Sequence, residues 1–109
     1  MHITIKRDEL VRPLTLVAGV VERRQTLPIL SYIKMRQAKG RLVLTGTDLE
    51  IEVSVEMPVS QGDAEITVPA RKLLDICRAL PEGSEIKLTK QGEKASLIAG
   101  KSRFTLITL

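Results

Sequence analysis

The chain opens with alternating apolar and polar positions and then changes to a helical spacing of apolar residues. Ile3 and Ile5 flank Thr4, which predicts a short strand. The apolar positions that follow are Leu10, Leu14, Val17 and Val21. Their spacing places them on one face of a helix over roughly residues 7–21. Pro13 lies inside this pattern, so the helix is expected to begin late or to bend there.

The same change of pattern occurs a second time, beginning at residue 66. Residues 66–68 (ITV) repeat the apolar and polar order of residues 3–5 (ITI), and a helical spacing follows again. A second helix is therefore predicted over roughly residues 70–80. Its apolar face consists of Leu73, Cys77 and Leu80.

Each predicted helix is followed by alternation that indicates three strands. The first copy has a longer loop before its strands, over residues 22–30, and its last strand, residues 49–56, carries acidic side chains on one face. Turns are expected at Lys39-Gly40, Gly46-Thr47-Asp48, Gln91-Gly92 and Gly100-Lys101. The predicted order is a strand, a helix and three strands, and this order occurs twice.

This repetition predicts one α+β domain over residues 1–109, because neither half buries its helix alone and 109 residues suit a single core. Both helices are expected to pack on one face of an antiparallel sheet. The hydrophobic fraction of 43% and the charged fraction of 28% are typical of a folded soluble protein. No apolar run approaches the roughly 18 residues of a membrane span, so no membrane partner is expected.

Lys6 and Arg7 lie where a signal peptide needs apolar residues, which favours a cytoplasmic protein. The single cysteine, Cys77, and the single histidine, His2, do not suffice for a disulfide or a zinc site. The seven glycines are scattered singly and form no phosphate-binding loop. The sequence therefore predicts no metal and no cofactor.

The net charge of +4 is unevenly distributed. Residues 1–41 hold nine Lys or Arg against three Asp or Glu, residues 42–70 hold none against six, and residues 71–109 hold eight against four. This asymmetry fits a module that binds a polyanion on a positive face, and it also fits an ordinary solvated surface. The only aromatic residues are Tyr32 and Phe104, so any nucleic acid is expected to be bound through its phosphates rather than by base stacking.

Catalytic candidates are poor. Asp48 and Glu50 stand two residues apart, but an Asp after Gly-Thr is typical of a turn. Cys77 falls on an apolar helix face, where a small buried thiol is expected. No catalytic residue is predicted, and an enzyme built around Asp48 and Glu50 is the weakest hypothesis.

Cations on the predicted helices are better candidates for function. Arg71, Lys72 and Arg78 lie away from the apolar face of the second helix, together with Asp75. The first helix carries Arg7 and Arg12 and leads into Arg23-Arg24. If the helices lie side by side, these cations form one patch for a phosphate backbone. Taken singly, each one equally fits a solvated helix face.

Five blocks of sequence carry a family resemblance. They are residues 24–30 (RQTLPIL), 42–50 (LVLTGTDLE), 68–72 (VPARK), 75–83 (DICRALPEG) and 102–104 (SRF). In order and spacing they closely resemble the amino-terminal domain of the bacterial DNA sliding clamp family, the beta subunit of DNA polymerase III. The resemblance implies a ring of two subunits with three such domains each, closed around duplex DNA. Helices line the hole and sheets form the outer wall of such a ring.

The resemblance also implies a function without enzymatic activity. The ring tethers the replicative DNA polymerase, and sequence-independent contacts let it slide. The sequence resembles only the first of the three domains, so two domains are expected to be absent. The pocket for polymerase and clamp-loader peptides then lies mainly in the absent part. An alternative from another class is a self-associating structural module that assembles head to tail through its sheet edges.

The resemblance assigns roles to individual residues. Arg24 and Arg71 match basic positions that contact DNA in the family. The residues that match the ring-closing interface with the second subunit are Lys72, Lys101, Arg103, Phe104 and Leu106. Phe104 and Leu106 are then expected to be exposed apolar residues on an edge strand. The alternative is that they fill the core.

Overall fold

A computed structural model describes residues 2–21, 31–47, 52–59 and 62–108. Its elements in chain order are β1 (His2–Lys6), α1 (Arg7–Val21), β2 (Tyr32–Ala38), β3 (Arg41–Thr47), β4 (Glu52–Pro58), β5 (Ala64–Pro69), α2 (Ala70–Ala79), β6 (Glu85–Gln91), β7 (Lys94–Ala99) and β8 (Ser102–Ile107). The predicted strand, helix and three strands, repeated twice, are therefore confirmed. No helix in the described ranges has the length and apolar character needed to cross a membrane.

The strands form two antiparallel sheets of four, in the orders β1-β6-β7-β8 and β4-β3-β2-β5. Each sheet takes three strands from one half of the chain and one strand from the other, because β1 pairs with β6 and β5 pairs with β2. The α+β class is as predicted, but the strands are divided between two sheets. Alternation along a strand identifies its buried face and says nothing about its neighbour in the sheet.

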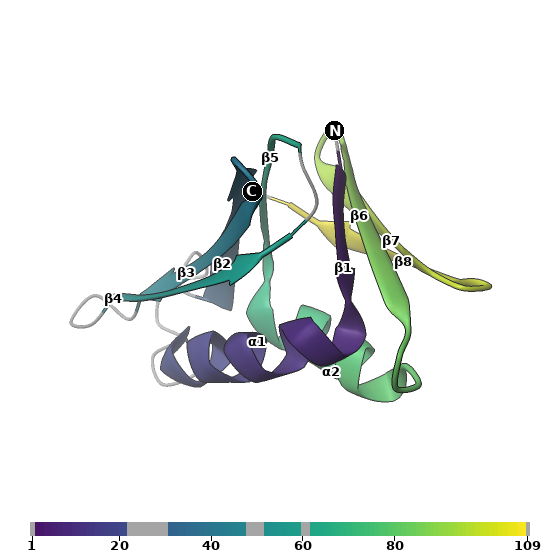
Figure 1. Cartoon of the computed structure of the whole chain (residues 1–109), viewed down its shortest axis with the longest axis horizontal. Coiled ribbons are helices and arrows are strands. Elements are labelled where there is room, and N and C mark those ends of the chain that lie inside the picture. Colours follow the sequence, from purple (N-terminus) through teal and green to yellow (C-terminus); the bar gives the residue numbers. More distant parts are fainter. Residues whose placement is uncertain (1, 22–30, 48–51, 60–61, 109) are drawn as a thin grey trace.

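Both helices lie in one layer beneath the two sheets (Figure 1). The core fills the space between this layer and the inner sheet faces, where Leu14, Ile33, Leu44, Leu73 and Leu88 are fully buried. Helix α1 contacts α2, β3 and β4, so it joins the helix layer to one of the sheets. The helices therefore present their remaining faces to solvent on the side away from the sheets.

Helix α1 begins at Arg7, directly after β1, and continues through Pro13 to Val21. The expected late start at Pro13 is wrong. Leu10 and Leu14, on either side of the proline, are both completely buried. Burial of these side chains offsets the backbone hydrogen bond that a proline inside a helix removes.

The two-residue turn at Lys39-Gly40 is confirmed. Both residues have positive φ, 54° and 77°, and they join Ala38 of β2 to Arg41 of β3. Two successive positive φ values match the turn type whose twist suits antiparallel strands.

The predicted turn at Gly46-Thr47 is wrong, because both residues belong to β3 and pair with β4. Asp48, which completes that prediction, lies outside the described residues. A Cβ on Gly46 would lie 2.7 Å from Cγ1 of Val17 and 2.9 Å from Cγ1 of Val21. Glycine is thus required at this position by the close approach of α1 to β3.

We expect Gly46→Ala to destabilise the fold by about 1–3 kcal/mol, because the added methyl group overlaps two buried valines. The matched control is Gly19→Ala in α1, where a Cβ would meet nothing within 4 Å. This control should stabilise the chain by about 0.5–1 kcal/mol through helix propensity. Urea unfolding of both variants measures the difference. Equal effects of the two substitutions would contradict the close approach.

Candidate nucleic-acid interface and sheet edge

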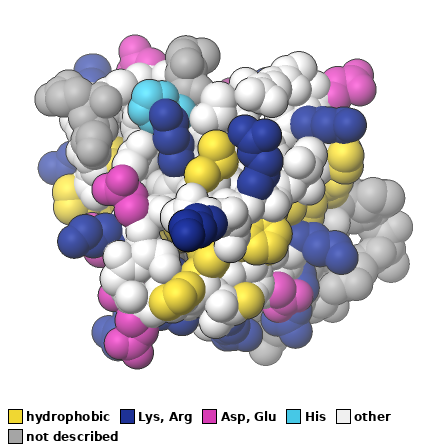
Figure 2. All heavy atoms as spheres, turned by 90° about the vertical axis from the view of Figure 1, so that its right-hand side faces the viewer, with side chains coloured by type: hydrophobic (Ala, Val, Ile, Leu, Met, Phe, Trp, Pro, Cys, Tyr) yellow, Lys and Arg dark blue, Asp and Glu magenta, His cyan; other side chains and the backbone are white. Residues whose placement is uncertain are grey.

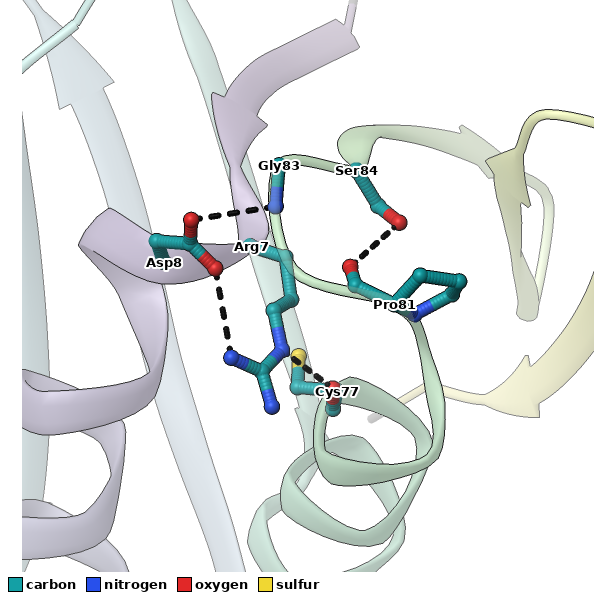
Figure 3. Close-up of polar contacts among 6 residues, drawn as sticks. All are labelled: Arg7, Asp8, Cys77, Pro81, Gly83 and Ser84. Carbon is teal, nitrogen blue, oxygen red and sulfur yellow. Dashed lines mark hydrogen bonds and ion pairs between the residues drawn. The ribbon is translucent and has the colours of Figure 1, made fainter.

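The two helices run in opposite directions where they meet, because the first residue of α1 contacts the last turn of α2. Nε of Arg7 donates a hydrogen bond to the carbonyl oxygen of Cys77 at 2.9 Å, and the backbone N–H of Arg7 donates to the carbonyl of Ser84 at 2.8 Å. Asp8 accepts a hydrogen bond from the backbone N–H of Gly83 at 3.0 Å. Figure 3 shows the side-chain contacts of this junction.

Arg7 therefore serves the fold rather than the predicted cation patch. Its guanidinium is 3.2 Å from the Asp8 carboxylate, and its side chain is only 19% exposed. An arginine beside the last carbonyls of a helix hydrogen-bonds to them and complements the helix dipole. Arg7 caps α2 and fastens the first half of the chain to the second.

Helix α2 presents the exposed charged face that its sequence predicted. Lys72 and Arg78 are exposed there, and the side chain of Arg71 is 58% exposed. Nε of Arg71 lies 3.9 Å from Oδ1 of Asp75, which is a loose ion pair one helical turn away. Arg12 is exposed on α1, in the same helix layer. Arg24, Asp48 and Glu50 lie outside the described residues.

The first turns of the two helices carry opposite charges. Helix α1 begins with Asp8 and Glu9, which suit the positive end of a helix dipole. Helix α2 has no acidic residue in its first turn and carries Arg71 and Lys72 there instead. Its N-cap, Pro69, makes no side-chain capping bond. Two cations at a helix N-terminus oppose the dipole and disfavour the isolated helix, but together with the positive end of the dipole they attract an anion.

Strand β8 forms one edge of its sheet. Four of the predicted interface residues lie on this strand or in the turn before it. Lys101 and Arg103 are exposed. Phe104 is partly buried against the core, and Leu106 is only 5% exposed. The expectation that both apolar residues are exposed is wrong for Leu106, because this residue lies opposite Ala95 on the inner face of the sheet.

Three features of the site were not predicted. Ile107 is 55% exposed on the outer face of β8, and the alternation of residues 104, 106 and 108 would have identified it once the inner face was known. The junction of Arg7 with Cys77 joins residues 70 positions apart and leaves no local signal in the sequence. The reversed charge of the first turn of α2 was visible in the sequence as Arg71-Lys72 after Pro69-Ala70.

Cys77 is completely buried, as its place on the apolar helix face predicted. Burial raises the pKa of its thiol from 9.0 to about 11, and the charge of nearby Arg7 partly opposes this shift. The thiol is therefore protonated in the folded protein at neutral pH. In the described ranges, no three His, Cys, Asp or Glu residues are grouped so as to hold a metal ion.

We expect Cys77 to react with a thiol reagent at about pH 8 at least roughly 100-fold more slowly in the folded chain than in urea, because thiolate is the reactive form. The raised pKa also favours folding below the unfolded value of 9.0, and this contribution is lost as the pH rises toward about 11. Labelling rates followed by mass spectrometry test the first point. Equal rates with and without urea would place Cys77 at the surface.

The geometry defines a duplicated α+β module with a helix layer on one side and free sheet edges. A protein-family model described as the N-terminal domain of the DNA polymerase III beta subunit matches residues 1–109. The chain therefore belongs to this family, which confirms the resemblance seen in the five sequence blocks.

Similar proteins agree with this assignment. The beta sliding clamp of Pseudomonas putida is 54% identical over 113 residues, and that of Escherichia coli K12 is 46% identical over 111 residues. Both alignments include the whole chain, which spans 30% of the length of these relatives. Among solved structures, the clamp from Pseudomonas aeruginosa bound to griselimycin is 51% identical with a TM-score of 0.93, and the clamp from Bartonella birtlesii is 41% identical with a TM-score of 0.94. These alignments cover all of the chain and 30% and 31% of the two structures.

Proposed function

We propose that this chain is the first domain of a sliding clamp, a ring that encircles duplex DNA and holds the replicative polymerase on its template. In this proposal the domain has no catalytic step. It contributes a segment of the helix-lined hole and one sheet edge for closing the ring. The polymerase and the clamp loader act on the whole ring, mainly through domains outside this chain. The family membership of the chain and its fold support the proposal.

The charge reversal in the first turn of α2 is the observation that carries the DNA-binding part of the proposal. Arg71 and Lys72 oppose the helix dipole, so they disfavour the isolated helix, and both remain exposed on the helix layer. A phosphate at this turn is held by Arg71 at the positive end of the helix dipole. Arg24, in the segment between α1 and β2, is proposed to add a further phosphate contact.

Such contacts suit a protein that must move along DNA. Arg and Lys neutralise phosphates without distinguishing bases, and each contact can be exchanged for the next as the ring advances. The described surface of the helices offers no aromatic side chain on which a base could stack. Retention on DNA then depends on the closed ring rather than on tight binding.

The β8 edge is proposed to meet another clamp domain. Lys101 and Arg103 are exposed there, and the partly buried Phe104 supplies an apolar contact whose remaining surface a partner strand covers. Leu106 supports this edge from the inner face of the sheet. Lys72, at the start of α2, is proposed to join the interface through its charge. An uncovered edge strand otherwise presents unpaired backbone groups to other chains.

We expect Arg24→Ala together with Arg71→Ala to weaken duplex binding equally on unrelated sequences. If each arginine neutralises one phosphate, the slope of log affinity against log salt falls by roughly 0.9 per residue removed. Fluorescence anisotropy with two duplexes of equal length, between about 50 and 200 mM salt, measures both quantities. The matched control is Arg36→Ala, since Arg36 is an exposed arginine on the outer face of a sheet.

The control should leave binding nearly unchanged, because Arg36 already pairs with Glu65 at 3.4 Å. A loss confined to one of the two sequences would overturn the phosphate mechanism. A loss per removed charge that is as large for Arg36→Ala as for the arginine pair would assign the effect to net charge and not to the helix layer.

We expect Phe104→Ala to impair ring assembly more than folding. The chain is mixed with a polypeptide that comprises the remainder of the Pseudomonas putida beta sliding clamp, and the mass of the complex is measured by light scattering. The control is Leu106→Ala, because Leu106 is 5% exposed and its truncation should cost about 2–5 kcal/mol of stability. Phe104→Ala should cost less stability and abolish more of the complex.

Two results would contradict this assignment. A loss of stability for Phe104→Ala as large as that for Leu106→Ala would place Phe104 in the core. Growth of the mass of the chain alone with its concentration, without the added polypeptide, would instead favour the self-associating module.

A further inference from the structure

The two sheets are equivalent in construction, and their hairpins relate positions in one to positions in the other. In β2 and β3 the turn joins Ala38 to Arg41, and in β6 and β7 the corresponding turn joins Gln91 to Lys94. Counting back along the strands, Lys34 corresponds to Lys87, and Arg41 corresponds to Lys94. All four side chains are exposed. The outer faces of the two sheets therefore carry a positive charge at the same two positions.

The outer face of the β4-β3-β2-β5 sheet is electrically balanced. Its cations are Lys34, Arg36 and Arg41, and its carboxylates are Glu52, Glu56 and Glu65. Arg36 pairs with Glu65 across β2 and β5, and Arg41 pairs with Glu56 across β3 and β4. Two of the three cations are thus paired within the sheet, and the numbers of cations and carboxylates on its strands are equal.

The outer face of the β1-β6-β7-β8 sheet lacks this balance. Lys87, Lys94 and Arg103 are exposed on it, and none of them forms an ion pair within the described residues. The positions that hold Glu56 and Glu65 in the other sheet are occupied here by Thr105 and His2. The one carboxylate among the strands of this outer face is Glu85, which lies opposite Lys6 at the end of the sheet.

Figure 2 faces this side of the molecule and shows Lys and Arg side chains across its middle, with hydrophobic side chains between them. One apolar neighbour is Ile98, which lies between Lys87 and Arg103 in the same cross-strand row. Unpaired cations on one face of a folded protein repel one another and attract anions from solution. A polyanion that spans the face relieves this repulsion and releases its own counterions.

The composition of the face favours phosphates over an acidic protein. Two of its three unpaired cations on β6 to β8 are lysines, which are depleted at protein interfaces but serve as point charges for phosphates. Neither Phe nor Tyr lies on this outer face, since Phe104 belongs to the inner face of β8 and Tyr32 to the other sheet. Contacts made here are therefore with the nucleic-acid backbone and not with stacked bases.

We propose that the outer face of the β1-β6-β7-β8 sheet is a second nucleic-acid surface, at which Lys87 and Lys94 bind phosphates without reading the base sequence. The inner face of this sheet covers the core, so the outer face points away from it. The surface therefore adds to the helix-layer contacts and does not depend on them. In a clamp it would hold a strand that runs outside the ring.

The test removes two charges from each sheet at equivalent positions. Lys87→Gln with Lys94→Gln is compared with the matched control Lys34→Gln with Arg41→Gln. Binding of the full chain to a labelled duplex and to a labelled single strand of equal length is measured by anisotropy over a range of salt. Urea midpoints confirm that each variant is folded, and a parallel series adds Arg71→Ala to each pair.

We expect the double substitution Lys87→Gln with Lys94→Gln to lower the slope of log affinity against log salt by about 1.8 on duplex and about 1.4 on a single strand. Affinity should drop on the order of 10-fold at low salt. The control pair should change affinity by less than about 2-fold, because the cations that it removes share their face with three carboxylates. The effect of Arg71→Ala on binding free energy should add to that of either double substitution, because substitutions at distant sites act independently.

The proposal is overturned if the Lys87 and Lys94 pair behaves like the control. It is also overturned if that pair leaves nucleic-acid binding intact but abolishes binding of a glutamate-rich peptide, which would make the face a protein-docking surface. An effect of Arg71→Ala without any effect of the Lys87 and Lys94 pair would support the helix layer alone. The reverse result would support the sheet face and contradict the proposed helix contacts.

Discussion

The exchange of one strand between the two halves is the constraint on which the rest of this structure depends. Because β1 completes the sheet of the second half and β5 completes the sheet of the first, neither half has a closed core without the other. Each exchanged strand runs directly into a helix, so the exchange also places both helices in one layer. Contacts of Arg7 and Asp8 with the end of α2 then fix where the first helix meets the second.

The charged residues of this fold divide into pairs that stabilise it and exposed cations that are available to a partner. Where the structure needs charges, they occur as partners, as in Arg7 with Asp8 and Arg36 with Glu65. Where cations stand at the positive end of α2 or without carboxylates on a sheet, they add nothing to folding. These cations lower the stability of the fold only slightly because they are exposed, and a bound anion turns their effect into a favourable one. The duplication makes the contrast visible, since Lys94 corresponds to Arg41, which pairs with Glu56 in the other sheet.

Periodicity in the sequence located the helices and most strands, because burial of one face imposes a repeat on each element. It failed where one residue type serves two purposes. Gly46 is expected in a turn, although glycine there allows α1 to approach β3 closely. The exposure expected of Leu106 came from the family resemblance and not from periodicity, and this residue faces the core. The pairing of strands and the Arg7 junction join residues far apart in the chain, so no local pattern encodes them. Family resemblance identified the candidate residues, but only the folded chain relates them to the balance of charge around them.

The strand exchange also determines how this domain can fold during synthesis. His2 pairs with Thr89, so the first strand to leave the ribosome has no partner until nearly the whole chain has emerged. Strands β2, β3 and β4 can form local hairpins earlier, but their sheet still awaits β5. Contacts between such distant residues close late and slow folding. Until then β1 and β2 each expose an unpaired edge, which makes the nascent first half the segment of the chain most in need of protection from aggregation.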